Sequence, residues 1–391
     1  MKIVVDELIP FAEEAYGPLG EVRTCSGRSM SAETVGDADA VIVRSITNVD
    51  EALLEGSSVR FVASATIGTD HVDHAYLKRK GIGFASAPGS NANAVAEYVA
   101  AALLHVAESQ SFELAGLTVG VVGVGNVGRR VVEKVSALGM EVLQCDPPRQ
   151  RVEGGDHWRT LDYVLSAADV ITLHTPLTRE GPDATYHLLG SRAFEMIKRK
   201  CLVINTSRGS VIDNRALLLA LRDGGPLGGA VLDVWESEPM VPLDLLAQTF
   251  IGTAHIAGYS YDGKVAATKM TSDAVCKFFH RRARWEHDWP AAPVPTVEVD
   301  RDRFSSDQAC LEAIVKRVYS IEREDDAFRQ MLNLPPDQRV DYFDNLRRQY
   351  PRRREFRWTT VNVKNASVEL RETLRGLGFE VAGESGSERA R

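Results

Sequence analysis

Three glycines between an apolar run and a helical pattern constrain the fold of this chain more than any other feature. Gly123, Gly125 and Gly128 have G-x-G-x-x-G spacing, directly after the apolar run and at the start of the helical pattern. In such a strand–turn–helix unit, the first glycine permits a tight turn, the second lets a pyrophosphate approach the backbone, and the third lets the helix pack closely on the strand. The amides of the helix N-terminus, at Asn126 and Val127, would face the anion. The stretch therefore predicts a dinucleotide-binding site.

The next apolar run ends at Asp146. At this distance from the glycines, a dinucleotide-binding fold places the acid that accepts hydrogen bonds from the adenosine ribose hydroxyls. A carboxylate repels a ribose phosphate, so Asp146 favours NAD over NADP. Arg149 and Arg151 follow it and could pair with a ribose phosphate, which leaves NADP as the weaker alternative.

Short apolar runs alternate with helical patterns along most of the chain. The runs lie at residues 2–6, 40–45, 60–66, 117–125, 141–146, 170–175, 201–207 and 230–235. Near-continuous apolar strands interleaved with helices are typical of parallel sheets that are covered on both faces. The pattern predicts an α/β protein with two such sheets, and the glycines make the second a Rossmann-type sheet.

Turn residues and prolines divide the chain into domains. Pro88 and Gly89 precede a long helical pattern at 91–109, so the first block ends near residue 93. A helical pattern at 262–282 closes the second block, and the proline-rich stretch that begins at Trp289 marks a linker. Beyond it we expect a small C-terminal α/β domain over 289–381 and a polar, frayed tail over 382–391. The expected elements of this domain are helices at 308–321, 336–350 and 367–378, a strand at 357–363 and a last strand near its end.

Composition excludes several classes of protein. The formal net charge of -8 over 391 residues offers no basic field for nucleic acid or an anionic membrane. The first residues lack the basic and apolar regions of a signal peptide, and the most apolar helical pattern is too short for a bilayer and carries Glu97. The five cysteines have neither the spacing of a zinc site nor the density of a disulfide scaffold. We expect a cytoplasmic protein with no membrane partner, no nucleic-acid partner and no metal site.

Polar residues follow three later apolar runs. The stretch INTSRGSVID brings Arg208, LDVWESEP brings Asp233 and Glu238, and TAHIAGYS brings His255. The carboxyl ends of parallel strands meet at the ligand crevice of an open sheet, so these residues are expected to converge. Each has another interpretation when taken alone. Arg208 could be a solvated turn residue, Glu238 an exposed loop acid, and His255 a core histidine.

Together, these residues supply what hydride transfer from a hydroxyl carbon to NAD requires. His255 can take the hydroxyl proton, because histidine titrates near neutral pH. Glu238, hydrogen-bonded to the other ring nitrogen, would orient His255 and favour the imidazolium. Arg208 offers a two-pronged cation that matches a carboxylate or a 2-oxo acid. Asp233 is expected to contact the cofactor, and the set predicts an NAD-dependent dehydrogenase.

The glycine turn, INTSRG at 204–209, LDVWESEP at 232–239 and HIAG at 255–258 occur in this order. Over about residues 1–285 the chain therefore resembles the D-isomer-specific 2-hydroxyacid dehydrogenases. The resemblance implies a catalytic trio of Arg208, Glu238 and His255, with further cofactor contacts at Thr175, Thr206, Asp233 and Gly258.

The same resemblance implies a domain arrangement. An NAD-binding Rossmann domain over residues 94–259 would be inserted in a flavodoxin-like substrate-binding domain. That domain would comprise residues 1–93 and be completed by about 260–288.

A closer resemblance covers the whole chain. Ser45 in VRS, Thr66 where many family members carry glycine, and the stretches APGSNANAVAEYV, CDPPR and HIAGYSYDGK are similar to one branch of the family. That branch oxidises a phosphorylated sugar acid in pyridoxal phosphate synthesis. The resemblance implies substrate contacts at Ser45, Thr66 and Tyr259, and a homodimer formed through the C-terminal domain. As alternatives, Tyr259 could pack at a helix start, and Ser45 and Thr66 could be turn hydroxyls.

The basic run at 347–357 and the function of the chain each have alternative interpretations. The basic run at 347–357 is interpreted as a solvated face, but in a dimer one of its arginines could reach a substrate phosphate bound to the partner subunit. The chain could also be a 3-phosphoglycerate or hydroxypyruvate enzyme, which shares the trio but does not call for Thr66 and Tyr259. A third possibility is an NAD-sensing, corepressor-like binding protein that retains the trio without turnover.

Overall fold

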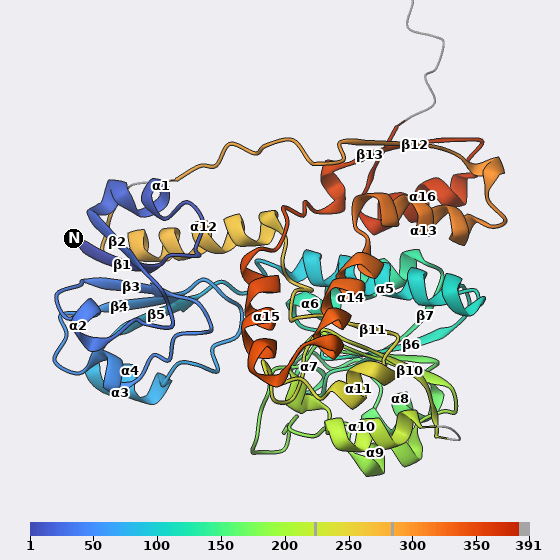
Figure 1. The fold of residues 1–391 in the computed structure, drawn as a ribbon, viewed down its shortest axis with the longest axis horizontal. Helices are drawn as coiled ribbons and strands as arrows, with labels where there is room; N and C mark the ends of the chain where they lie inside the picture. Colours follow the sequence, from blue (N-terminus) through green and yellow to red (C-terminus); the bar gives the residue numbers. More distant parts are fainter. Residues whose placement is uncertain (223–224, 283–284, 383–391) are drawn as a thin grey trace, which may run out of the picture. The chain divides into compact units, whose positions relative to one another are not determined.

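The computed structural model describes residues 1–222, 225–282 and 285–382 (Figure 1). The chain divides into two compact units, Met1–Ala92 with Ser260–Pro290, and Asn93–Tyr259 with Ala291–Arg391. In the described part of the chain, no helix is both long enough and apolar enough to cross a membrane. The predicted frayed tail lies, from residue 383 onward, outside the described residues.

The first unit contains a five-stranded parallel sheet in the order β2-β1-β3-β4-β5, which is the flavodoxin-like order. Side chains of β1 alternate between two cores: Ile3 and Val5 pack with α1 and α12, and Val4 packs with α2, α3 and α4. Both faces of the sheet are therefore covered, as the apolar runs predict. The elements are β1 (Lys2–Asp6), α1 (Ala12–Tyr16), β2 (Glu21–Cys25), α2 (Ala32–Val35), β3 (Ala40–Val43), α3 (Glu51–Leu54), β4 (Phe61–Ser64), α4 (His74–Lys80), β5 (Gly83–Ser86) and α12 (Tyr261–Phe278).

The second unit contains a six-stranded parallel sheet in the order β11-β10-β9-β8-β6-β7. The strand that would lie beyond β7 in a Rossmann sheet is reduced to one parallel bridge between Gln144 and Trp158. From residue 92 to residue 252, the helices and strands of this unit are α5 (Ala92–Gln110), β6 (Thr118–Val122), α6 (Asn126–Ala137), β7 (Glu141–Cys145), α7 (Pro147–Glu153), α8 (Leu161–Ala167), β8 (Val170–Leu173), α9 (Ser191–Met196), β9 (Cys201–Asn205), α10 (Asn214–Leu221), β10 (Leu227–Leu232), α11 (Leu243–Gln248) and β11 (Ile251–Gly252).

The C-terminal residues form a separate small parallel sheet, β12-β13-β14, and contribute the helices α13 to α16 (Figure 1). Its elements are β12 (Thr296–Asp300), α13 (Asp307–Val318), α14 (Ile321–Arg329), α15 (Pro336–Arg348), β13 (Thr360–Lys364), α16 (Val368–Leu377) and β14 (Glu380–Val381). The predicted α/β class, the Rossmann-type sheet and the small C-terminal domain are confirmed.

Several contacts attach these C-terminal elements to the Rossmann sheet of the same unit. Helix α16 packs against α6, where a Cβ on Gly376 would lie 2.4 Å from that of Ala137. The buried ammonium of Lys134 donates a hydrogen bond of 2.7 Å to the carbonyl of Leu377. On another side, Asp325 of α14 accepts a 2.7 Å hydrogen bond from the amide of Gly252 in β11. The second unit is thus continuous from the glycine turn to α16.

The interpretation of residues 347–357 as a solvated face is wrong for Arg353 and Arg354, whose exposed fractions are 6% and 3%. Arg353 donates to the carbonyls of Ala94 and Ala257 at 2.9 and 3.3 Å, and pairs with the buried Glu97 at 3.3 Å. Its guanidinium also lies 3.7 Å from the ring centroid of Tyr319. Buried arginines are found where carbonyl and carboxylate acceptors satisfy them, and a run of basic letters does not show such acceptors.

Candidate active site

The glycine turn has the geometry that its spacing predicts. Gly123 has φ +84°, and a Cβ there would lie 2.8 Å from the carbonyl of His174. A Cβ on Gly128 would lie 2.0 Å from the carbonyl oxygen of Gly123, so the helix packs directly on the turn. A Cβ on Gly125, in contrast, would meet no atom within 4 Å. The space above Gly125 is where a pyrophosphate would approach the exposed first turn of α6, at Asn126.

Asp146 directly follows β7 and caps the start of α7, beside this turn. Its carboxylate accepts hydrogen bonds from the amides of Val124 and Arg149, at 2.8 and 3.0 Å, which fixes the turn and the start of α7. The two arginines that could have paired with a ribose phosphate are engaged elsewhere. Arg149 forms an ion pair with Glu153 at 2.8 Å, and Arg151 pairs with Asp183. This pairing favours NAD over NADP.

The residues at the end of β8 and β9 also fit a bound dinucleotide. The hydroxyl of Thr175 is buried and has no hydrogen-bond partner within the described structure, which suits a donor or acceptor supplied by a ligand. Next to it, His174 contacts the hydroxyls of Thr172 and Thr206 at 2.9 and 3.2 Å. Gly258 lies half-exposed at the other predicted contact. Together with the glycine turn, these positions form a fitting site for NAD.

His174 makes stability depend on pH. Burial lowers its pKa from 6.5 to about 3, so the folded protein keeps the ring neutral where the unfolded chain would protonate it. The neutral His174 therefore contributes stability to the fold above pH 6.5, the pKa of histidine in the unfolded chain. This stability is lost as the pH falls from 6.5 towards 3, and about 2 kcal/mol is lost at pH 5. We expect His174→Gln to flatten the fall in unfolding free energy between pH 7 and pH 5 by that amount. The exposed His157→Gln is the control, and parallel curves for wild type and His174→Gln would contradict the assignment.

Two glycine substitutions separate cofactor binding from folding. Gly125→Ala adds a methyl group to open space and is expected to weaken NAD binding at least about tenfold while leaving the melting temperature nearly unchanged. Gly128→Ala forces its methyl onto the Gly123 carbonyl and is expected to cost about 1–3 kcal/mol of stability. Titration calorimetry with NAD and thermal melting measure the two effects. Unchanged NAD affinity in Gly125→Ala would show that no ligand approaches this turn.

Glu238 and His255 form a hydrogen-bonded pair. Nδ1 of His255 lies 2.5 Å from Oε1 of Glu238, and Oε2 of Glu238 accepts a 3.1 Å hydrogen bond from the amide of Trp235. Burial raises the pKa of Glu238, but His255, the Trp235 amide and the Arg347 cation outweigh it, so the net pKa is lowered and the carboxylate stays ionised. The pairing occupies one ring nitrogen and leaves Nε2 to exchange a proton with a substrate, which is the arrangement of a general acid–base catalyst.

Asp233 positions the histidine turn. Its buried carboxylate accepts hydrogen bonds from the hydroxyl of Thr253 and the amides of Ile256 and Ala257, at 2.7, 2.6 and 3.0 Å. The carbonyl of Asp233 also accepts from the amide of His255, at 2.7 Å. These bonds hold His255 in its left-handed conformation, with φ 56°. The predicted contact between Asp233 and the cofactor stays a prediction.

Arg208 lies in the loop after β9. Its Nη1 donates a 2.8 Å hydrogen bond to the carbonyl of Ser207, and its own carbonyl accepts one of 2.9 Å from the Asn205 side chain. A Cβ on Gly209 would lie 2.0 Å from the carbonyl of Trp235, so the Arg208 loop packs on the backbone that leads to Glu238. The three predicted catalytic residues therefore come from neighbouring strand ends of one sheet.

The predicted substrate contacts are divided between the two units. In the first unit, Ser45 is exposed after β3, and Thr66 follows the adjacent β4. The hydroxyl of Thr66 lies 2.7 Å from that of Ser64 and donates to the carbonyl of Gly68 at 3.1 Å. In the second unit, the ring of Tyr259 lies edge-on to Tyr350, with 5.6 Å between centroids.

The sequence does not predict that two arginines of the basic run lie near the catalytic turn of their own chain. Arg353 contacts the carbonyl of Ala257, two residues after His255, and Arg347 lies over the ring of Tyr259. The only signal in the sequence was the basic run that contains both. Its position after a proline-rich linker gave no sign that it returns to the Rossmann sheet.

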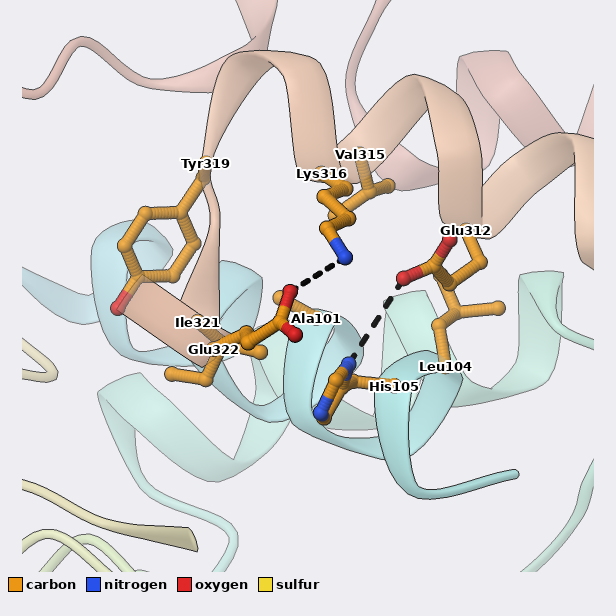
Figure 2. Close-up of a pocket in the computed structure, with 9 residues that line it drawn as sticks. All are labelled: Ala101, Leu104, His105, Glu312, Val315, Lys316, Tyr319, Ile321 and Glu322. Atoms are coloured by element: carbon orange, nitrogen blue, oxygen red, sulfur yellow. Dashed lines mark ion pairs between the residues drawn. The ribbon is translucent and has the colours of Figure 1, made fainter. Parts of the chain in front are cut away.

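A small polar hollow lies between α5 and the helices α13 and α14 (Figure 2). In it, the carboxylate of Glu312 lies 3.8 Å from His105, and the carboxylate of Glu322 forms an ion pair with Lys316. None of the predicted site residues lines it, and its charges are paired internally. Throughout the described residues, no group of three or more His, Cys, Asp or Glu side chains could hold a metal ion.

Comparisons with known proteins agree with this geometry. The family model of the D-isomer specific 2-hydroxyacid dehydrogenase NAD binding domain matches residues 91–257, and that of a domain of unknown function, DUF3410, matches residues 290–378. The crystal structure of D-lactate dehydrogenase from Aquifex aeolicus, complexed with NAD and lactic acid, is similar with a TM-score of 0.61 and 26% identity, over 72% of this chain and 96% of that chain. Fold and site thus define an NAD-dependent oxidoreductase of the D-2-hydroxyacid dehydrogenase class.

Relatives that match along the whole chain narrow the class. Proteins from Sodalis glossinidius and Klebsiella pneumoniae, each named erythronate-4-phosphate dehydrogenase, are 44% identical to this chain over 97% of its length and 98% of theirs. The chain belongs to the erythronate-4-phosphate dehydrogenase family.

Proposed function

We propose that this protein oxidises 4-phospho-D-erythronate to 2-oxo-3-hydroxy-4-phosphobutanoate, with NAD as hydride acceptor, in the synthesis of pyridoxal 5'-phosphate. The observation that carries the proposal is the 2.5 Å pair of Glu238 and His255 at the strand ends of an NAD-binding sheet. Identity of 44% to named erythronate-4-phosphate dehydrogenases supports the choice of substrate.

The chain's own residues account for binding and proton transfer. Arg208 holds the substrate carboxylate, and Nε2 of His255 takes the hydroxyl proton as the hydride leaves the same carbon. The ionised Glu238 stabilises the imidazolium that results. NAD, when bound, supplies the carbon that accepts the hydride. The glycine turn, Asp146, Thr175, Thr206 and Gly258 would hold it.

The domain roles follow from the same proposal. Residues 1–93 with 260–288 bind the substrate through Ser45 and Thr66, and residues 94–259 bind NAD and contribute Tyr259. Residues 289–381 form the interface of a homodimer. We place the enzyme in the cytoplasm, which is supported by its five free cysteines.

The test is turnover of 4-phospho-D-erythronate by the purified protein, with a 2-oxo acid present to reoxidise the cofactor. Comparison substrates are 3-phosphoglycerate, D-glycerate and unphosphorylated D-erythronate. A clear preference for 4-phospho-D-erythronate is expected. A preference for 3-phosphoglycerate would move the substrate within the class, and NAD binding without turnover of any acid would favour a cofactor-sensing binding protein.

A further inference from the structure

Arg347 is a half-buried cation beside residues of the catalytic turn. It lies in the last turn of α15, and its guanidinium carbon is 5.7 Å from the ring centroid of Tyr259. Its Nε atom is buried and has no hydrogen-bond partner among the described residues. An unused donor in this position is costly unless a ligand or water satisfies it. Arg347 therefore has capacity to bind an additional acceptor.

Aromatic packing fixes the helix that carries Arg347. Phe343 on α15 packs on Phe328 of α14 at 6.0 Å, and Phe328 packs on Trp235 at 5.6 Å, measured between ring centroids. All three rings are almost completely buried. Trp235 is the residue whose amide holds Glu238. Helices α14 and α15 thus share one core with the residue whose amide binds the Glu238 carboxylate.

Hydrogen bonds hold α14, and with it α15, on the edge of the Rossmann sheet. Asp325 accepts from the amide of Gly252 at 2.7 Å, and Arg329 donates to the carbonyls of Leu246 and Thr249 at 3.0 and 2.7 Å. The position of Arg347 is therefore defined by the same unit that carries His255.

The surroundings of Arg347 keep it charged. Burial lowers its pKa, but Tyr259, Glu238 and Asp344 raise it more, so the net pKa is raised. The carboxylate of Glu238 also pairs with His255 at 2.5 Å, so it does not fully neutralise the charge of Arg347. A cation with a free donor remains beside the predicted substrate-binding tyrosine.

We propose that Arg347 binds the phosphate of the substrate and acts in the subunit whose Glu238 and His255 perform the chemistry. This inference rests on the proposed function. Arg208 is assigned to the carboxylate at one end of the four-carbon acid, and the phosphate at the other end needs a cation of its own. A guanidinium offers a fork of donors that matches phosphate, and Tyr259 adds a hydroxyl next to it. The assignment replaces the expectation that an arginine of this run serves the partner subunit.

A comparison of two substrates tests the proposal. In Arg347→Gln, kcat/KM for 4-phospho-D-erythronate is expected to fall at least about 30-fold, while kcat/KM for D-erythronate changes less than about threefold. Arg348→Gln is the matched control, because this neighbour on α15 is exposed and its contact is with Asn345. An equal fall on both substrates would assign Arg347 a purely structural role, and no fall on either would show that it does not act.

Binding measurements make the test independent of slow turnover. The dissociation constants of both acids are measured on NAD-loaded His255→Asn protein, with and without Arg347→Gln. Only the constant for 4-phospho-D-erythronate is expected to rise. If wild type prefers an unphosphorylated acid, the proposed function fails and this proposal fails with it. If wild type prefers 4-phospho-D-erythronate but Arg347→Gln weakens both acids equally, only the role of Arg347 is wrong.

Mixed dimers distinguish action within a subunit from action across the interface. A heterodimer of Arg347→Gln and His255→Asn subunits contains one intact site only if Arg347 serves the partner. Activity no greater than that of the two parent variants is expected. Recovery of about half the wild-type activity would overturn the assignment to the same subunit.

Discussion

Replacing His255 with Asn is expected to lower kcat about 10²- to 10⁴-fold while NAD binding is retained, because the variant loses the group that exchanges the hydroxyl proton. Asn tolerates the left-handed backbone at this position, where φ is 56°, so the fold should persist. Steady-state kinetics and calorimetric titration with NAD measure the two properties.

The control for this substitution is His280→Asn. His280 is exposed and also left-handed, with φ 52°, so it reproduces the change of side chain and of backbone preference away from the catalytic pair. Wild-type activity is expected in the control. Retention of more than about a tenth of kcat in His255→Asn would remove the histidine from the mechanism.

Replacing Arg208 with Lys is expected to lower kcat/KM about 100-fold with little change in NAD affinity. One nitrogen of Arg208 already donates to the Ser207 carbonyl at 2.8 Å, which orients the rest of the guanidinium. A lysine ammonium can keep the charge, but it cannot hold this carbonyl and also present two parallel donors to a carboxylate. Kinetics with the preferred acid measure the effect.

Arg215→Lys on α10 is the matched control for the charge and size change, since Arg215 is exposed. It is expected to behave as wild type. Near-normal kcat/KM in Arg208→Lys would mean that a point charge is sufficient and that the two-pronged contact is not formed.

The central strands could be predicted from the sequence, and several edge strands could not. β1, β3, β4, β6, β8, β9 and β10 lie inside their sheets and are covered on both faces, so they read as continuous apolar runs. β2, β5 and β12 lie at sheet edges and were not predicted. An edge strand has one neighbour and tolerates polar or small residues, as in the half-exposed EVRTC and GFAS, so its pattern is weak.

The glycine turn was readable because its requirements are local. Each of the three glycines is required by the local backbone: by a positive φ at Gly123, by the open approach at Gly125, and by the close packing of the helix on the turn at Gly128. The pairing of Glu238 with His255 could be expected for a similar reason, since parallel strands deliver their carboxyl ends to one edge.

Long-range contacts of charged groups could not be read in the same way. The carboxylate of Asp233 accepts hydrogen bonds from Thr253, Ile256 and Ala257, and the sequence pattern does not show these contacts. Arg347 and Arg353 reach the catalytic turn only because α14 and α15 fold back on β11 and Trp235. Hydrophobic periodicity fixes which face of a helix is buried, but it does not specify which distant element covers that face.

The most direct test of the central claim follows the hydrogen on the hydroxyl-bearing carbon. A single turnover of 4-phospho-D-erythronate deuterated at C2 is run with NAD and analysed by mass spectrometry of the cofactor. We expect one deuterium to appear in NADH, and to appear there more slowly than protium does in the unlabelled reaction. Unlabelled NADH, with the deuterium lost to water, would contradict hydride transfer from C2 and with it the assigned roles of His255 and Arg208.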